Sequence, residues 1–166
     1  MRWVLVAIGT SLCLHAGAVA SAESDPLPVP EGGGRQQAVG AYNDGVRLML
    51  DKRYPDAQRK FEEAIALETS LAEAHNNLAF SLRMQGTQNF ERALKHYNRA
   101  IELKPDLAQA YMYRGVLFTQ SGDLRRAAED HARLLRLDKE LAAKLEAVIV
   151  GRVLNEGTAG LAAQHE

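Results

Sequence analysis

Cysteine is nearly absent from this sequence: Cys13 is the single one in 166 residues, so no disulfide can form within the chain. Aromatic residues are also scarce, at 6%, although hydrophobic residues make up 46%. A core built mainly from Leu, Ala and Val favours helix packing over a β-sandwich. The chain also has no excess of basic residues: it contains 20 Lys and Arg and 21 Asp and Glu, which gives a net charge of -1. This balance argues against nucleic acid as a partner.

The N-terminal residues have the pattern of a secretory signal. Arg2 precedes an apolar stretch over residues 3–14, and small residues follow in two small-x-small cleavage patterns at 18–20 and 20–22. We therefore expect a cleavable signal peptide over residues 1–22 and a periplasmic or secreted protein. The alternative is an uncleaved anchor facing the periplasm, which is the one case in which we expect membrane association.

Residues 23–37 are rich in turn-forming residues: prolines alternate with other residues and three glycines then run together. Such a composition cannot bury a core and predicts an extended or disordered tether. The glycine run lacks the Gly-Lys-Ser/Thr ending of a phosphate loop. We expect the remaining chain to be a repeat domain over 38–154 and a flexible tail over 155–166.

Small residues inside apolar stretches recur at a fixed distance, which indicates internal repeats. One series is Gly45, Ala79 and Gly115, and the other is Ala57, Ala93 and Ala127. The two series agree on a period of 34 if the middle repeat carries two extra residues in the turn at 86–89. Apolar residues follow helical spacing on both sides of that turn, over 71–85 and 90–103. This spacing predicts two helices in each repeat.

Capping residues agree with these boundaries. Ser70 and Glu73 fit a capping box, and Asp106, Asp123 and Asp138 stand where N-caps are wanted. Pro55 falls in the first turn of a helix, where its missing N–H costs nothing. Asp138 would begin a seventh helix over 139–154, whose expected packing face comprises Leu141, Leu145, Val148, Ile149 and Val153.

Over residues 38–141 the sequence resembles the tetratricopeptide repeat family, and with its expected signal it resembles the bacterial exported type. The family's eighth position is small, and its twentieth is alanine, as in the two series above. Its aromatic twenty-fourth position is matched by Phe61 and Tyr97 but is His131 in the third repeat, and its closing proline survives only as Pro105. The resemblance implies an all-α, right-handed superhelical solenoid of three helix pairs plus a C-terminal capping helix.

The resemblance also implies a binding groove. In that family the first helix of each pair lines a concave surface that holds partner segments. The candidate groove residues here are Tyr42, Val46, Met49, Asn76, Asn77, Phe80, Arg83, Met84, Met112, Tyr113 and Val116. Large apolar residues on an exposed face suggest a protein partner, and we expect an apolar or amphipathic segment anchored on Tyr42, Phe80 and Met112. The alternative is that many of these residues pack against a neighbouring first helix or under the capping helix.

Some members of the family grip a C-terminal carboxylate with lysine, arginine and asparagine side chains. At the corresponding positions this chain has Tyr42, Val46, Asn77, Gln109 and Tyr113, of which only Asn77 fits. A carboxylate ligand is therefore not expected.

Neither a metal site nor catalysis is predicted. His75, His96 and His131 fall on three different predicted helices with no cysteine available as a co-ligand, so we expect no metal or other cofactor. No nucleophile and base stand in a recognisable arrangement, and no small-molecule substrate is expected. The sequence predicts a non-enzymatic adaptor or scaffold, and the alternative is a structural subunit of a cell-envelope assembly that docks through its capping helix.

Overall fold

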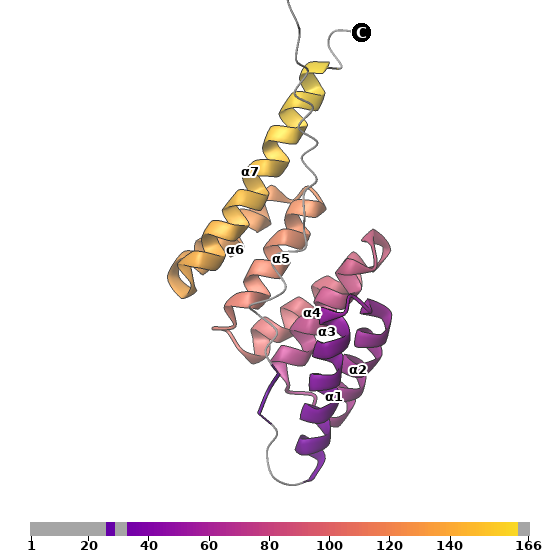
Figure 1. Ribbon diagram of the computed structural model, residues 1–166. Coiled ribbons are helices and arrows are strands. Elements are labelled where there is room, and N and C mark those ends of the chain that lie inside the picture. Colours follow the sequence, from indigo (N-terminus) through magenta and orange to yellow (C-terminus); the bar gives the residue numbers. More distant parts are fainter. Residues whose placement is uncertain (1–25, 29–32, 163–166) are drawn as a thin grey trace, which may run out of the picture.

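A computed structural model of the protein describes residues 26–28 and 33–162, and its helices confirm the all-α prediction (Figure 1). The α-helices are α1 (Gly33–Leu50), α2 (Tyr54–Leu67), α3 (Ala72–Met84), α4 (Phe90–Leu103), α5 (Ala108–Gln120), α6 (Leu124–Leu137) and α7 (Lys139–Ala162). A short 3-10 helix, η1 (Thr87–Asn89), joins α3 to α4 at the predicted two-residue insertion. Within these described ranges there is no strand.

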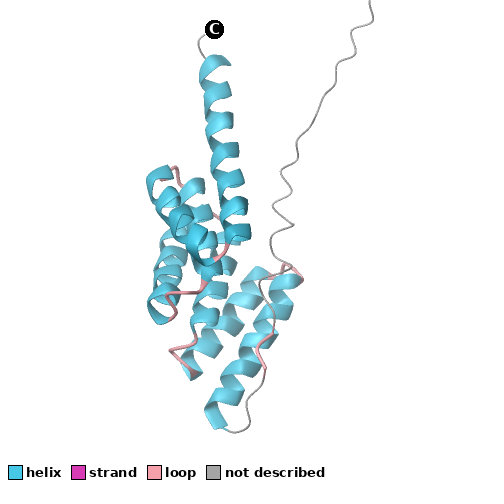
Figure 2. Ribbon diagram, turned by 90° about the vertical axis from the view of Figure 1, so that its left-hand side faces the viewer, coloured by secondary structure: helices cyan, strands magenta, loops and turns pink. Residues whose placement is uncertain are grey.

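The helices form three successive pairs and a cap. Within the pairs α1 packs on α2, α3 on α4 and α5 on α6. Neighbouring pairs touch through α2 and α3 and through α4 and α5, and α3 also contacts both α1 and α5. Helix α7 packs against α5 and α6 and extends beyond them (Figures 1 and 2). This arrangement confirms the solenoid of three helix pairs with a capping helix.

Two of the small residues are required by close helix contacts. A Cβ atom added to Gly45 of α1 would lie 2.6 Å from the Phe61 ring of α2, and one added to Gly115 of α5 would lie 2.5 Å from Leu145 of α7. Both distances are below van der Waals contact, so the eighth repeat position is small because another side chain occupies the space. In the third repeat that side chain comes from the capping helix.

The expected caps are correct at some helices and wrong at others. Asp123 accepts from the Arg126 backbone N–H, and Asp138 accepts from those of Glu140 and Leu141, as predicted. Pro55 lies in the first turn of α2, also as predicted. The capping box is wrong, because α3 begins after Leu71 and the Ser70 side chain bonds Glu68 instead.

Asp106 and the other member of the capping box, Glu73, are also misplaced as caps. Helix α5 begins after Leu107 without a side-chain cap, so Asp106 is one residue too early. Glu73 lies in the first turn of α3 but binds Lys104 across the pair, with 2.9 Å between Oε1 and Nζ.

The ends of the repeat domain differ from the predicted boundaries. Helix α1 begins at Gly33, inside the predicted tether over 23–37, because Arg35 and the glutamines after it are good helix formers. Helix α7 continues to Ala162 through part of the predicted tail over 155–166. On α7, Leu141 and Leu145 are buried as expected, but Val153 is 48% exposed, in the C-terminal part of α7 that extends beyond α5 and α6 (Figure 1).

The predicted signal segment over 1–22 lies outside the described residues. Among the helices that are described, none combines the length and the apolar character needed to cross a bilayer.

The twentieth repeat position supplies a test of the internal packing. Ala93 of α4 is fully buried, so Ala93→Leu should overpack the contact between the helices of the middle pair. We expect the free energy of unfolding to fall by ~1–3 kcal/mol in urea titrations. Ala132→Leu is the matched control, because Ala132 is exposed on α6, and it should change stability by less than ~0.5 kcal/mol.

Candidate functional site

The candidate site is the face formed by α1, α3 and α5, the first helices of the three pairs, which is called the inner face below. It carries all the residues predicted to line the groove. Most of these are buried: Tyr42, Val46, Met49, Asn76, Asn77, Phe80, Met112 and Tyr113. Arg83, Met84 and Val116 are partly exposed. The prediction of large apolar anchors on an open surface is therefore wrong for Tyr42, Phe80 and Met112.

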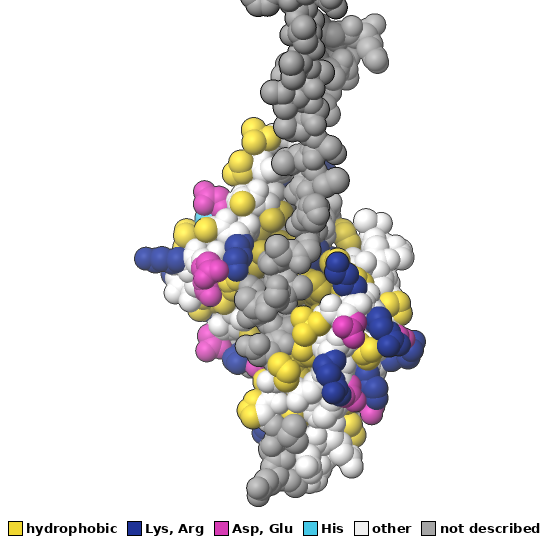
Figure 3. Space-filling view, in the orientation of Figure 1, with side chains coloured by type: hydrophobic (Ala, Val, Ile, Leu, Met, Phe, Trp, Pro, Cys, Tyr) yellow, Lys and Arg dark blue, Asp and Glu magenta, His cyan; other side chains and the backbone are white. Residues whose placement is uncertain are grey.

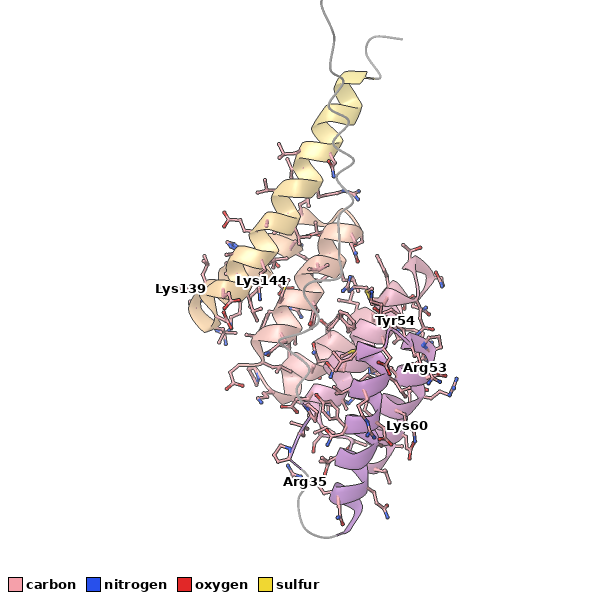
Figure 4. The ribbon with its side chains drawn as sticks, in the orientation of Figure 1. Arg35, Arg53, Tyr54, Lys60, Lys139 and Lys144 are labelled. Carbon is pink, nitrogen blue, oxygen red and sulfur yellow. The ribbon has the colours of Figure 1, made fainter. Side chains whose placement is uncertain are left out.

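Packing against α2 explains the burial of Tyr42, and packing against both α2 and α5 explains that of Phe80. The Tyr42 ring lies 5.8 Å from that of Phe61, and the Phe80 ring lies 5.0 Å from that of Tyr113, which bridges α3 and α5. Tyr54, labelled in Figure 4, begins α2 and places its ring 6.2 Å from that of Phe80. These aromatic pairs stabilise the stack of repeats, so they are unavailable as free anchors.

The capping helix explains the burial of Met112. This residue packs in a cluster with Leu134 of α6 and with Leu141 and Leu145 of α7, and Val116 packs against the same cluster. The third repeat thus uses its inner-face residues to hold the cap, which is the alternative left open by the sequence.

Polar side chains connect α1 and α3 across the inner face. The Asn76 amide donates to Asn77 Oδ1 at 3.1 Å, and the Asn77 amide donates to the Tyr42 hydroxyl at 3.0 Å. All three residues are buried, yet Asn76 Oδ1 has no hydrogen-bond partner. A buried acceptor without a partner is costly, and a ligand N–H would satisfy this oxygen once the side chains that cover it move aside.

Arg83 is the cationic member of the inner face. Its guanidinium stacks 5.2 Å from the centre of the Phe80 ring, and its Nη1 donates to Gln120 of α5 at 3.1 Å. Near it, burial raises the pKa of Tyr97 to about 12, so this tyrosine stays neutral. Arg83 is thus engaged by an aromatic ring and a neutral amide, and neither contact forms an ion pair.

The structure adds two residues that the sequence analysis did not select, Asn43 and Leu27. The Asn43 side chain of α1 accepts from the Leu27 backbone N–H at 2.8 Å and donates to the Leu27 carbonyl at 2.9 Å. Leu27 also packs against the main hydrophobic core. Asn43 occupies the sixth repeat position, which the carboxylate-binding pattern does not use in its first repeat, so that pattern offered no signal.

The histidines His75 and His96, predicted on different helices, lie face to face between α3 and α4. Their Nδ1 atoms are 3.0 Å apart, and His75 Nε2 lies 3.3 Å from the Thr69 carbonyl. Because a carbonyl only accepts, His75 Nε2 carries the hydrogen, and His75 Nδ1 accepts from His96. Within the described residues no three His, Cys, Asp or Glu side chains gather as a metal site would require.

The histidine pair predicts a pH dependence of stability. The pKa of His96 is lowered to about 4, mainly by burial and also by the nearby His75 and Arg92, while Glu62 opposes the shift. Burial also lowers the pKa of His75. Between about pH 6.5 and about pH 4 the unfolded chain binds more protons than the folded one, so the free energy of unfolding falls as the pH falls.

Because the His96 ring is partly exposed, we expect its titration to lower the free energy of unfolding by only ~1–2 kcal/mol between about pH 7 and about pH 5. Urea unfolding at both pH values measures it. His96→Asn should remove this part of the loss, and His131→Asn, outside the pair, should retain it. An equal loss in wild type and His96→Asn would assign the pH dependence to other groups.

The chain is similar in sequence to known proteins with tetratricopeptide repeats. A profile of the TPR repeat matches residues 87–122. The chain is 35% identical over 111 residues to tetratricopeptide repeat protein 36 of Xenopus tropicalis, which covers 64% of this chain and 54% of that protein. It is 30% identical over 94 residues to the photosystem I assembly protein Ycf3 of Acaryochloris marina, over 56% of this chain and 55% of the relative. The chain therefore spans about half the length of the curated relatives it matches.

Two solved structures share the arrangement of helix pairs. The second TPR domain of Spaghetti (RPAP3), bound to the HSP90 peptide SRMEEVD, is 27% identical with a TM-score of 0.59, over 63% of this chain and 94% of that domain. The TPR2B domain of yeast Sti1, in a complex with an Hsp70 peptide, is 20% identical with a TM-score of 0.65, over 72% and 98% of the two chains. The second likeness concerns the fold alone.

Proposed function

Because this chain is a tetratricopeptide repeat protein, we propose that it is a non-enzymatic adaptor that binds an apolar or amphipathic partner segment on its inner face. The observation that carries the proposal is the buried Asn76 Oδ1, an acceptor without a partner. Leaving such a group unpaired costs ~1–3 kcal/mol, and a backbone N–H of a bound segment would recover part of that. The partly exposed Met84 and Val116 supply apolar surface on the same face.

The similar RPAP3 domain is bound to a peptide that ends in acidic residues, but this chain favours a different ligand. None of the clamp positions at Tyr42, Val46, Gln109 and Tyr113 holds a cation. The single match, Asn77, already donates to the Tyr42 hydroxyl. A carboxylate on this face would lose its hydration without gaining a charged partner, so the proposed ligand is apolar or amphipathic.

The adaptor proposal is tested with Asn76→Ala. The variant removes the unpaired acceptor, so the partner that wild type captures from an envelope extract should bind about tenfold more weakly, the scale of one buried hydrogen bond. Affinity should change little between low and high salt, because no ion pair is expected to carry the contact. Asn89→Ala is the matched control, since Asn89 lies in η1 and makes no side-chain cap.

Two results would contradict the adaptor proposal. One is partner binding that requires a free C-terminal carboxylate or is lost at high salt. The other is partner binding that is unchanged in Asn76→Ala while circular dichroism shows the same helicity.

The export of the protein is part of the same proposal. It is supported by Arg2, the apolar stretch over 3–14 and the small residues that follow. Mass spectrometry of the native protein should find a chain that begins near Ser21 or Glu23. A retained Met1 in the membrane fraction would instead favour the membrane-anchored alternative, facing the periplasm.

A second candidate function is a structural subunit that docks through α7. It is supported by the exposed apolar residues Val150, Val153 and Leu154, of which Leu154 is 63% exposed. In this case Val150→Asp combined with Leu154→Asp should release the chain from its assembly without changing its stability. Asn76→Ala should leave that assembly intact, which distinguishes the two candidates.

A further inference from the structure

A short stretch of the chain itself, Pro26 to Pro28, lies alongside α1 (Figures 1 and 2). The two prolines are exposed, whereas Leu27 between them is half-buried and packs against the main core. The backbone of Leu27 makes two hydrogen bonds, and both go to the side chain of Asn43, with distances of 2.8 and 2.9 Å. One amide group therefore holds this part of the segment.

The contact has the chemistry of backbone recognition. An asparagine amide offers a donor and an acceptor together, as a neighbouring strand does, and so it binds an extended backbone without regard to the side chain. Pro26 and Pro28 have no N–H, which leaves Leu27 as the single backbone donor of the segment. Prolines also hold the chain in an extended form before it binds, and this lowers the entropy lost on binding.

The leucine adds selectivity to this backbone contact. Its side chain reaches the core cluster, which contains Tyr42 and Val46 of α1. Figure 3 shows hydrophobic side chains near the middle of this view and charged side chains on both sides of them. On the right, Figure 4 labels Arg53, just before α2, and Lys60 of α2. The arrangement suits a short, extended, uncharged segment with a leucine between prolines.

We propose that residues 26–28 are a resident ligand of the inner face, and that a partner segment of the same chemistry competes with them for Asn43. This inference rests on the proposed adaptor function and specifies its ligand. Sixteen positions separate Leu27 from Asn43, and so short a connection gives an effective concentration on the order of 1 mM. If the free segment has a dissociation constant of about 0.1 mM, the resident copy lowers the apparent affinity of a competitor roughly tenfold.

The experiment measures the binding of a fluorescein-labelled peptide with the sequence of residues 23–31 to the full chain, by fluorescence anisotropy. The peptide should bind Leu27→Ser roughly tenfold more tightly than wild type, because without the packing of the leucine on the core the resident segment binds only weakly and hardly competes. Adding Asn43→Ala to Leu27→Ser should weaken peptide binding at least about tenfold. Adding Asn89→Ala instead should leave it unchanged, and circular dichroism should show equal helicity in all variants.

A second readout observes the resident contact without a competitor. In the wild-type chain the Asn43 side-chain amide protons should be shifted in the nitrogen–proton NMR spectrum relative to Leu27→Ser, because one of them donates to the Leu27 carbonyl. The labelled peptide should restore the wild-type shift when added to Leu27→Ser.

Equal peptide affinity for wild type and Leu27→Ser would overturn the proposal, and so would the absence of binding to Leu27→Ser. Either result leaves the adaptor function standing if partner capture still depends on Asn76. Conversely, if Asn76→Ala does not affect capture but the peptide competes as described, the adaptor proposal fails and the resident ligand stands.

Discussion

Replacing Arg114 with methionine is expected to lower the free energy of unfolding by ~3–5 kcal/mol, a large fraction of the stability of a domain of this size. Arg114 of α5 reaches Asp130 of α6 with two hydrogen bonds, from Nε at 3.0 Å and from Nη2 at 2.6 Å. Its third nitrogen donates to Asn98 of α4 at 2.8 Å. One side chain thus ties the third pair to the second.

The large effect follows from the burial of Asp130, which is 2% exposed. Burial raises the pKa of this carboxyl group even though Arg114 opposes the shift, so the carboxylate depends on its partner to remain charged. Arg114→Met keeps much of the packing on Tyr111 and Phe118, over which the guanidinium stacks, but leaves the buried charge unpaired.

Urea unfolding of three variants measures the coupling. Arg114→Met combined with Asp130→Leu should be much more stable than Arg114→Met alone, because the second change removes the unpaired charge. Arg125→Met is the control: its pair with Glu129 is exposed on both sides and should contribute less than ~1 kcal/mol. A loss of similar size in Arg114→Met and Arg125→Met would show that the buried pair is no more important than a surface pair.

The fold could be predicted from the sequence because the repeat signal depends on local spacing and on size. Gly45 and Gly115 are small where a side chain from another helix fills the space, and Ala79, at the same position of the middle pair, is fully buried. The starts of α3 and α5 were predicted one residue too early, because a cap is correct only when the register is accurate to one residue. Ser70 is one position before the N-cap of α3, so its hydroxyl binds Glu68 instead.

The candidate site was harder to predict, because its residues have two uses that the sequence does not separate. Phe80 and Met112 have the spacing of groove residues, but one packs on Tyr113 and the other under α7. The facing histidines lie 21 positions apart on two helices, and only the rotation of each helix brings them together. Asn43 became recognisable only through its contact with Leu27, since an isolated asparagine on a helix carries no signal.

The capping helix carries the second large prediction. The Leu145 side chain of α7 is fully buried, and it fills the space left by the missing side chain of Gly115. Leu145→Ala should therefore create a cavity between α5 and α7 that costs ~2–5 kcal/mol. Val150→Ala on the same helix is the control, because Val150 is 49% exposed, and its effect should remain within ~0.5 kcal/mol.

Removing the whole helix by truncation after Asp138 should have a larger effect than Leu145→Ala. The buried Tyr111, Met112 and Leu134 all pack in the cluster that Leu141 and Leu145 complete, and without α7 they would face water. Their combined exposure should lower the melting temperature and promote aggregation, which calorimetry and size-exclusion chromatography would detect. If the truncated chain stays monomeric with an unchanged melting temperature, α7 is not a cap and is instead available as a docking arm for the assembly of the second candidate function.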